Sequence, residues 1–505
     1  MEPRFDRIIK NARVVRPGGG PAPRSTVDIA IAGEKIAAVA PQIDPQSAKQ
    51  VDDARSLLAF PGVVDAHMHV GIYHPLEEDA FRESIAAAAG GVTSSINYMR
   101  TGQYYLNRGG PYHEFFPEVL RQSSGRFHVD YAYHLAPISR GHIKEMESLV
   151  SEYGVTSFKI FMFYGSHGLH GRSNSQNGFL MIDDDERYDI AHFEFVMREL
   201  ARLRRERQDW HDGLSLSLHC ELGEILTAYT KIVEGDPSMT GLRAYSASRP
   251  PHSEGLAVWI ASYLAHETEC PNINLLHLSS AKAIEAAITM KRVLQHVNFR
   301  REVTVGHLLM DYDSAAGNTA KVNPPIRSRE DVERLWRAVL EGDVDWVCSD
   351  HACCSHEKKI DPKQPDNVFA AKSGFGGTDY LLSGLFSEGT RRGLDAGRIA
   401  DLLCRAPAQR YGLVSKGDID VGMDADVVLF DPDETFVVRG KESLSGQGYT
   451  PFEGMELTGR VKTTYLRGEK IWGGGRVLGA PRGRYINRLD GLRAGPPKPT
   501  RGAGR

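Results

Sequence analysis

The chain has 505 residues, 41% of them hydrophobic and 25% charged, a balance typical of a soluble globular protein with two or three domains. A formal net charge of −4 and a pI of about 6.6 argue against a protein that binds nucleic acid or an anionic membrane surface. Because no apolar run could span a bilayer, no secretory signal is recognisable and the six cysteines form no CxxC pair, we expect a cytoplasmic enzyme with reduced thiols.

Residues 1–56 predict the N-terminal part of a small β-domain. Short strand-like pieces alternate with Pro and Gly punctuation, as in RIIKNARVV and DIAIAGEKIAAVA. The Gly-rich stretch RPGGGPAPRS joins two of these strands and precedes no helix. We therefore interpret it as a loop and not as a phosphate-binding turn.

Residues 57–409 predict an α/β fold, a (β/α)8 barrel of the TIM type. Segments with helical patterning, such as FRESIAAAAG and AKAIEAAITMKRVLQ, lie between most of a series of short apolar runs. There are eight such runs: FPGVVDAHMH, GVTSSINYM, HVDYAYHLA, VTSFKIFMF, LSLSLHC, INLLHLSS, EVTVGHLLM and VDWVCSD. Strands that are buried on both faces and alternate with helices are typical of this barrel.

The C-terminal part of the chain reverts to strands and turns. Residues 410–475 contain GDIDVGMDADVVLFDP and GRVKTTYLRGEKIW, and we expect them to form one small β-sandwich domain together with the N-terminal segment. Residues 476–505 are rich in Arg, Gly and Pro and have too few apolar residues to fold alone. They predict a flexible tail.

Polar side chains recur where the predicted strands end, which is the face of a barrel that carries function. The first run ends in His67 and His69, which are two residues apart and can therefore face the same way. The fifth run ends in His219, the sixth in His277 and the eighth in Asp350. Each alone has a structural explanation: a chance HxH, a hydrogen-bonded core histidine or a helix N-cap. Their joint placement predicts a metal site.

Lys159 stands in the middle of the fourth apolar run, where a buried ammonium would be costly. An edge strand that lets the amine reach solvent is the alternative. Imidazole and carboxylate ligands suit zinc, although other divalent transition metals are possible, and five ligands exceed the need of one tetrahedral ion. A neutral amine can add CO2 to become a carbamate, an anion able to bridge two cations. An N6-carboxylysine at position 159 would explain the burial.

These motifs resemble those of the amidohydrolase superfamily, within it the cyclic amidases: hydantoinase/dihydropyrimidinase, with allantoinase and dihydroorotase as cousins. The resemblance covers about residues 5 to 475. VDAHMH resembles the first-strand metal motif, GVTSFKIFM the carboxylated-lysine motif, and HCELGE and LLHLSS the segments with the other histidines. SRPPHSEG resembles a connector of the hydantoinase type, NPPIR and CSDHACC the loop after strand seven and the catalytic aspartate, and TPFEGMELTGRV the closing β-domain.

The resemblance implies ligands for two divalent ions, with zinc expected: His67, His69 and Asp350 for one, His219 and His277 for the other, and carboxylated Lys159 and a hydroxide bridging both. Asp350 would take the proton of the attacking hydroxide and deliver it to the leaving nitrogen. Tyr164 would donate to the developing oxyanion, the alternative being an aromatic barrel residue. Substrate amide contacts are expected from the main chain near Asn323 and in the loop 372–377, at Gly374.

We therefore expect hydrolytic opening of a hydantoin or dihydropyrimidine ring to an N-carbamoyl amino acid, a choice favoured over the cousins by Tyr164. Another cyclic substrate (a cyclic imide, allantoin or dihydroorotate) is the first alternative, and a non-catalytic scaffold the second. A small-molecule substrate and no nucleic-acid or membrane partner are expected. Since relatives are commonly homotetramers, we also expect a homo-oligomer, either a dimer or a tetramer.

Two segments depart from the family pattern, and both would shape the pocket for a substituent on the ring. The loop after Tyr164, GSHGLHGRSNSQNGFLMIDDDE, is longer than expected. The segment after His69, VGIYHPLEEDAF, is shorter than expected. For His167 and His170 in the longer loop, solvated side chains are expected, with ligand or substrate contact as the alternative. Cys353 and Cys354 could line the pocket, but no base that would activate them is identifiable.

Overall fold

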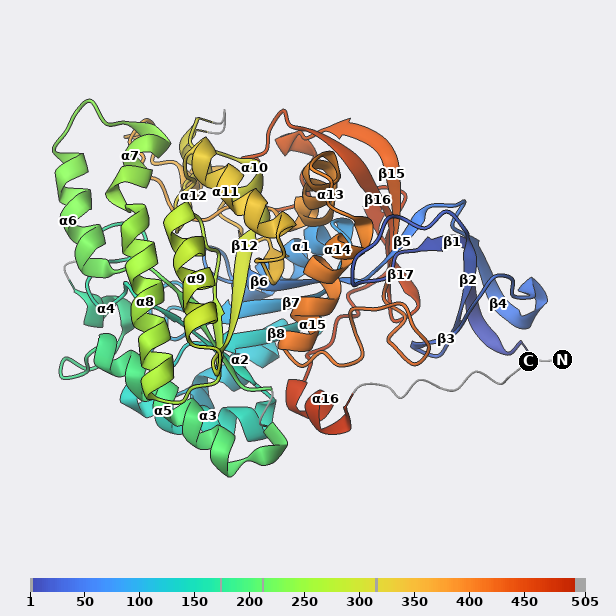
Figure 1. Cartoon of the computed structure of the whole chain (residues 1–505), viewed down its shortest axis with the longest axis horizontal. Coiled ribbons are helices and arrows are strands. Elements are labelled where there is room, and N and C mark those ends of the chain that lie inside the picture. Colours follow the sequence, from blue (N-terminus) through green and yellow to red (C-terminus); the bar gives the residue numbers. More distant parts are fainter. Residues whose placement is uncertain (1–2, 173–174, 211–212, 314–316, 496–505) are drawn as a thin grey trace.

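The computed structural model describes residues 3–172, 175–210, 213–313 and 317–495. These residues form two nine-stranded sheets (Figure 1), one curled into a barrel with helices outside it and one at the opposite end of the molecule from α6 and α7. Both the predicted (β/α)8 barrel and the predicted β-domain built from the two ends of the chain are therefore confirmed. Among the described residues, no helix has the length and apolar character needed to cross a membrane.

The barrel strands are parallel and follow one another in chain order around the sheet. They are β6 (Val63–His69), β7 (Val92–Met99), β8 (Asp130–Leu135), β9 (Ser157–Phe161), β10 (Ser215–His219), β11 (Asn272–Leu275), β12 (Asn298–Thr304), β13 (Trp346–Cys348) and β14 (His351–Ala352). The predicted runs contain β6 to β10 and β13 completely. β11 begins one residue before its run, β12 overlaps its run only at its last three residues, and β14 follows the last run. Every residue of β6 to β11 is buried, because helices cover the sheet on the outside and side chains fill the inside.

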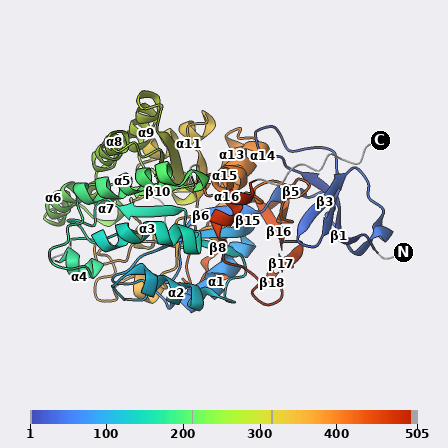
Figure 2. The same ribbon diagram turned by 90° about the horizontal axis from the view of Figure 1, so that it is seen from below.

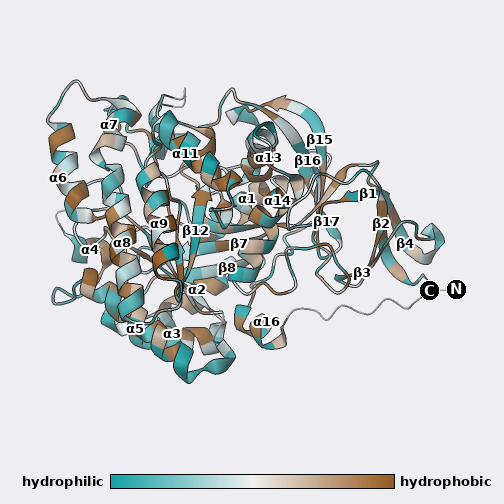
Figure 3. Cartoon of the chain, viewed as in Figure 1, coloured by the Kyte–Doolittle hydropathy of each residue, from teal (hydrophilic) through white to brown (hydrophobic). Residues whose placement is uncertain are grey.

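The longer barrel helices are α1 (Leu76–Ala89), α2 (Tyr112–Ser123), α3 (Arg140–Tyr153), α5 (Ile190–Glu206), α6 (Gly223–Glu234), α7 (Gly241–Ser248), α8 (Pro251–Glu267), α9 (Ala281–Val293), α11 (Arg329–Leu340) and α13 (Leu381–Arg391). The shorter ones are α4 (Gln176–Leu180), α10 (Val305–Leu309), α12 (His356–Lys359), α14 (Ala396–Ala400), α15 (Ala406–Arg410) and α16 (Arg488–Ala494). Outer helices such as α3 and α5 carry both hydrophobic and hydrophilic residues (Figure 3), as expected for helices with one face on a sheet and one in water.

The eighth barrel strand is interrupted at Ser349 and Asp350. β13 pairs with β12 before the break and β14 pairs with β6 after it, so the ring closes across the interruption. Asp350 has a φ of 53°, a left-handed conformation that costs energy for a residue with a side chain. The break therefore stores strain at the mouth of the barrel, beside His69 at the end of β6.

The second sheet joins the two ends of the chain. Its strands are β1 (Phe5–Val14), β2 (Val27–Ala32), β3 (Lys35–Ala40), β4 (Ala48–Asp53), β5 (Leu58–Pro61), β15 (Val427–Val437), β16 (Glu456–Leu466), β17 (Glu469–Gly473) and β18 (Arg476–Val477). β5 pairs with β1 on one side and β15 on the other, so it links the N-terminal to the C-terminal strands. It lies beyond the boundary predicted at residue 56, because its apolar sequence runs on into that of β6.

The predicted flexible tail is structured over residues 476–495, which differs from our expectation. This segment contains β18 and α16, and Figure 2 shows α16 beside the barrel. Arg488 is fully buried and donates to Ser157 Oγ at 2.5 Å and to the Tyr133 carbonyl at 2.7 Å. Composition alone missed this, since apolar residues of the segment such as Tyr485 and Leu489 pack against the barrel instead of forming a core of their own. Residues 496–505 lie outside the described part of the chain.

A buried ion cluster connects the β-domain to the barrel. Lys416 donates to Asp130 Oδ2, on β8, at 2.9 Å and to Asp426 Oδ2, just before β15, at 2.7 Å. Arg467 also contacts Asp130 and donates from its main chain to Asp426 at 2.8 Å. Two buried carboxylates thus depend on two cations for compensation.

Replacing Lys416 by methionine should leave these carboxylates with too little positive charge. We expect the free energy of unfolding to fall by roughly 3 kcal/mol, because breaking a buried pair leaves an uncompensated charge. The matched control is Lys462→Met, whose partner Glu434 lies at the surface, where a loss below about 1 kcal/mol is expected. Denaturant or thermal unfolding would measure both, and equal losses would contradict this role of Lys416.

Candidate metal centre and substrate cavity

Two histidines at the end of β6 form the first part of the candidate metal centre. His67 and His69 are both buried, and their Nε2 atoms lie 3.3 Å apart because alternate residues of a strand point the same way. His67 Nδ1 donates to Glu302 Oε1 at 2.7 Å. That bond fixes the proton on Nδ1 and leaves the lone pair of Nε2 directed into the barrel mouth.

Lys159 and Asp350 meet these two imidazoles. Lys159 Nζ lies 2.5 Å from His67 Nε2 and 3.3 Å from His69 Nε2. Asp350 Oδ1 lies 3.0 Å and 3.2 Å from the same two nitrogens. Burial lowers the pKa of the Lys159 amine to about 8, although Asp350 and Glu302 act in the opposite direction. A buried amine that loses its proton easily is the form that can add CO2.

His219 and His277 complete the group from β10 and from the turn after β11. Their ring centres lie 4.3 Å apart, and the His277 ring lies 5.3 Å from that of His67. The Nδ1 atoms of both are buried without a hydrogen-bond partner among the described residues. His67, His277 and Asp350 each offer one ligand atom within 4.8 Å of the others. The structure therefore brings together all six residues that the sequence predicts as metal ligands.

The donor set fits divalent metal ions. Ring nitrogens of the histidines and the carboxylate of Asp350 converge on the same small volume, and the Nδ1 atoms of His219 and His277 have no partner there among the described residues, as expected where a cation would bind. Burial lowers the pKa of His219 to about 4 and that of His69 to about 3, so both rings stay neutral and able to bind metal at pH 7. His67 and His69 hold the pKa of Asp350 well below its usual value despite its burial.

Glu302, on β12, is a supporting residue that the sequence reasoning missed. Besides accepting from His67, it accepts from Trp346 Nε1 at 2.8 Å and from the His277 main chain at 3.1 Å. Glu302 thus orients both His67 and His277, which are predicted to bind different metal ions. Its signal was present in the sequence, since it is the one acidic residue in the apolar run EVTVGHLLM.

Two further supporting residues that the sequence analysis missed, Glu221 and Arg249, hold His219 in place. His219 Nε2 donates to Glu221 Oε2 at 2.6 Å, which leaves Nδ1 as the free nitrogen. Arg249 holds Glu221 in turn, donating to Oε1 at 3.0 Å and to Oε2 at 2.5 Å, and all three side chains are buried. Both residues lie in motifs that the sequence singled out, HCELGE and SRPPHSEG, but only their spatial contact reveals this role.

A cavity of about 40 Å³ opens beside the ligands, and three residues predicted to contact substrate line it: Tyr164, Asn323 and Gly374. Burial raises the pKa of Tyr164 to about 12, partly offset by Arg100, so the phenol stays a hydrogen-bond donor at neutral pH. The Asn323 side chain is already engaged, accepting from Tyr245 and donating to the Leu169 carbonyl at 2.7 Å. That leaves its main chain to meet a substrate.

Two buried lysines hold the loops around this cavity. Lys359 donates to the carbonyl oxygens of Lys321 at 2.7 Å and Gly374 at 2.6 Å. Lys321 donates to the carbonyls of His170 at 3.2 Å and Ala371 at 2.7 Å. Burial lowers the pKa of Lys359 to about 7. Carbonyl groups of three separate segments are therefore fixed by only two side chains.

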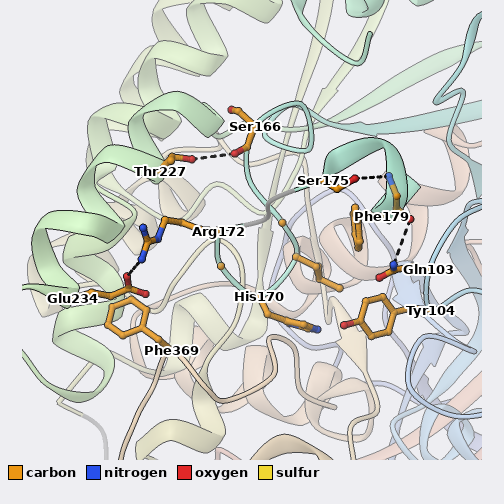
Figure 4. Close-up of a pocket in the computed structure, with 14 residues that line it drawn as sticks. Gln103, Tyr104, Ser166, His170, Arg172, Ser175, Phe179, Thr227, Glu234 and Phe369 are labelled. Atoms are coloured by element: carbon orange, nitrogen blue, oxygen red, sulfur yellow. Dashed lines mark hydrogen bonds and ion pairs between the residues drawn. The ribbon is translucent and has the colours of Figure 1, made fainter. Parts of the chain in front are cut away.

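The long loop after Tyr164 borders a larger outer pocket of about 890 Å³ (Figure 4). Leu169 lines both this pocket and the central cavity. His170 packs with its ring centre 5.4 Å from that of Tyr104 and accepts from the Ser373 main chain at 3.2 Å. His167 is buried, with Nδ1 3.3 Å from Thr227 Oγ1. The expectation of solvated histidines in this loop is wrong, because the loop folds back onto the barrel.

Cys353 and Cys354 do not belong to the lining of the central cavity, although their neighbour Ala352 does. Both are buried, and burial raises the pKa of both thiols. Thiolates are therefore disfavoured at neutral pH, which agrees with the absence of an activating base in the sequence.

Substituting Glu302 by glutamine should weaken metal binding without removing a ligand. Because the carboxylate orients both His67 and the turn of His277, we expect metal affinity to fall by about 10- to 100-fold. Competition with a chelator would measure it. Glu285→Gln is the matched control, since that carboxylate is exposed and pairs with Arg334 away from the candidate ligands. Equal affinity of E302Q and the wild type would contradict the orienting role.

Comparison with known proteins agrees with this geometry. Residues 253–471 match the model of the amidohydrolase family. An allantoinase of Rubrobacter xylanophilus is 32% identical over 485 residues, which cover 95% of this chain and 97% of that protein. An allantoinase of Solibacter usitatus is 31% identical over 469 residues, which cover 92% of this chain and 93% of that protein.

Solved structures with the same fold include the dihydropyrimidinase of Brevibacillus agri, with a TM-score of 0.81, 26% identity and coverage of 95% of this chain and 98% of that one. The L-hydantoinase (dihydropyrimidinase) of Arthrobacter aurescens has a TM-score of 0.80, 27% identity and coverage of 94% and 98%. Sequence relatives and structural neighbours thus act on related rings. The chain belongs to the cyclic amidase group of the amidohydrolase superfamily and is a hydrolase of cyclic amides.

Proposed function

We propose that this enzyme uses two divalent metal ions to open a cyclic ureide, a hydantoin or dihydropyrimidine ring, to an N-carbamoyl product. Water adds to a ring carbonyl carbon, the bond from that carbon to nitrogen breaks, and the nitrogen leaves with a proton. The observation that carries the proposal is one cavity lined by His69, His277, Asp350 and Tyr164, with the Lys159 amine directly behind the histidines.

The ligands of the two ions would be His67, His69 and Asp350 for one and His219 and His277 for the other, with carboxylated Lys159 shared between them. Zinc is the ion we propose, because imidazole and carboxylate donors suit it. Bound ions of this kind polarise a carbonyl and make water nucleophilic at neutral pH. The orphaned Nδ1 atoms of His219 and His277 support this assignment.

The chain's own groups would handle the proton and the substrate. Asp350 would take a proton from the attacking water and hand it to the departing ring nitrogen, since its carboxylate lines the cavity and lies within 3.2 Å of the ring nitrogens of His67 and His69. Tyr164 donates its hydroxyl hydrogen to the carbonyl oxygen as negative charge develops there. The main chain at Asn323 and Gly374, fixed by the buried lysines, holds the ring amide.

Allantoin is the second candidate substrate, favoured by the relatives that are named allantoinases. Allantoin is itself a hydantoin with a ureido substituent, so the same ligands and the same cavity could serve both. The outer pocket that shares Leu169 with the cavity offers room for such a substituent. The choice between a bare and a substituted ring therefore depends on the loops and not on the metal centre.

A substrate panel tests the proposal. We would measure ring opening of hydantoin, 5-alkyl hydantoins, allantoin, dihydrouracil, dihydroorotate and a cyclic imide by the zinc-loaded enzyme. Turnover of a hydantoin ring with little activity on dihydroorotate is the expected result. Failure to open any panel member, despite a full complement of metal, would favour the non-catalytic alternative.

Two substitutions separate metal binding from proton transfer. Lys159→Ala should strip metal and abolish turnover, because it removes the proposed bridge. Asp350→Asn should retain at least one ion but lose turnover, because an amide cannot accept the proton. Elemental analysis and steady-state kinetics on the same samples would check both. Full activity in either variant would contradict the assigned roles.

The homo-oligomer and the cytoplasmic location stay predictions. An apolar stripe on α8 is compatible with contact between copies, since Leu256, Trp259 and Tyr263 point outward with 47%, 48% and 61% of their surfaces exposed. Light scattering of the purified protein would give its oligomeric state.

A further inference from the structure

Arg100 is a buried cation that the proposed reaction has not yet used. It follows β7 directly and has no exposed surface. Nη1 donates to the Thr101 carbonyl at 2.8 Å, whereas Nε and Nη2 are buried without a hydrogen-bond acceptor among the described residues. Leaving charged N–H groups unpaired in the interior is costly. A buried arginine with unpaired N–H groups is therefore expected to have a function that offsets this cost.

The surroundings of Arg100 are aromatic. Its guanidinium carbon lies 4.5 Å from the ring centre of Phe179 and 5.4 Å from those of Tyr105 and Tyr164. The groups that favour its charge, against the effect of burial, are phenols, and no carboxylate is among them. Contacts with ring faces recover part of the desolvation cost. A neutral side chain of similar size would fill this space without that cost, so packing alone does not explain an arginine here.

Tyr164 connects Arg100 to the site of reaction. Tyr164 lines the central cavity, whereas Arg100 does not. The Tyr164 ring stacks on Phe161 with centres 4.7 Å apart and planes at 12°, and the Phe161 ring centre lies 4.5 Å from Lys159 Nζ. Tyr164 therefore shares the cavity lining with candidate metal ligands, and its ring also lies close to a guanidinium outside that lining.

We propose that Arg100 is a positioning residue that acts through Tyr164. When Tyr164 donates to the carbonyl oxygen in the transition state, negative charge shifts onto the phenol oxygen, and the guanidinium stabilises that charge. No proton leaves either side chain in this step. The low polarity of the site makes such a fixed charge more effective than it would be in water. The inference rests on the proposed role of Tyr164 as the oxyanion donor.

A double-mutant cycle tests this dependence, using the panel member that the wild type opens fastest. Tyr164→Phe should lower kcat by roughly 100- to 1000-fold. Arg100→Met should lower kcat by about 10- to 100-fold with KM changed less than about threefold, because a charge-assisted contact is lost only in the transition state. In the Tyr164→Phe background, Arg100→Met should cause almost no further loss.

The variant Arg100→Lys distinguishes the effect of the charge from the effect of packing. It keeps the cation, so its kcat should stay much closer to the wild-type value than that of Arg100→Met. Metal content and thermal unfolding of every variant identify a change in folding. Losses that multiply in the double variant, or equal kcat values for the Met and Lys variants, would overturn the proposal in favour of a structural role. A wild type without turnover would instead refute the proposed function itself, so the two failures are distinguishable.

Discussion

The burial of one amine beside two histidines and a carboxylate is the constraint on which this site depends. Lys159 Nζ lies 2.5 Å from a ring nitrogen of His67, whose proton is held on the other nitrogen by Glu302. Asp350 Oδ1 faces that same ring nitrogen at 3.0 Å. Acceptor atoms brought so close destabilise the protein unless a cation lies near them. The arrangement is therefore one that a bound cation would stabilise, and Glu302 and Glu221 hold the side chains in it.

That support requires the closed barrel. The ligands come from β6, β9, β10, the turn after β11 and the break between β13 and β14, so no single segment of chain contains a complete site. Asp350 reaches the centre only because the eighth strand stops and adopts a left-handed conformation there. Glu302 on β12 orients His67 across the barrel, and Glu221 orients His219, two residues before it. The candidate metal-binding residues thus come together only when the ring of barrel strands is closed.

The residues for chemistry and those for substrate choice belong to different parts of the fold. The ligands lie on strands, where packing fixes them. The groups around the cavity lie on loops near Tyr164, Asn323 and Gly374, which Lys321 and Lys359 hold by their carbonyl oxygens. This chain shares its fold with solved hydantoinases and is similar in sequence to allantoinases along most of its length.

The sequence by itself determined the barrel, the small β-domain and the six ligand candidates, because strands alternating with helices force residues at strand ends to one face. It also singled out Lys159, since a lysine within an apolar strand needs an explanation, and carboxylation of its amine stays a proposal. It did not find the contacts of Glu302 with His67, of Arg249 with Glu221 or of Arg100 with Tyr164, in which each partner comes from a distant part of the chain. It was wrong about the segment 476–495 and about His167, because packing against distant parts of the fold decides whether such segments are ordered. Patterns in sequence record which face of an element is buried, whereas only the tertiary structure decides which buried groups meet.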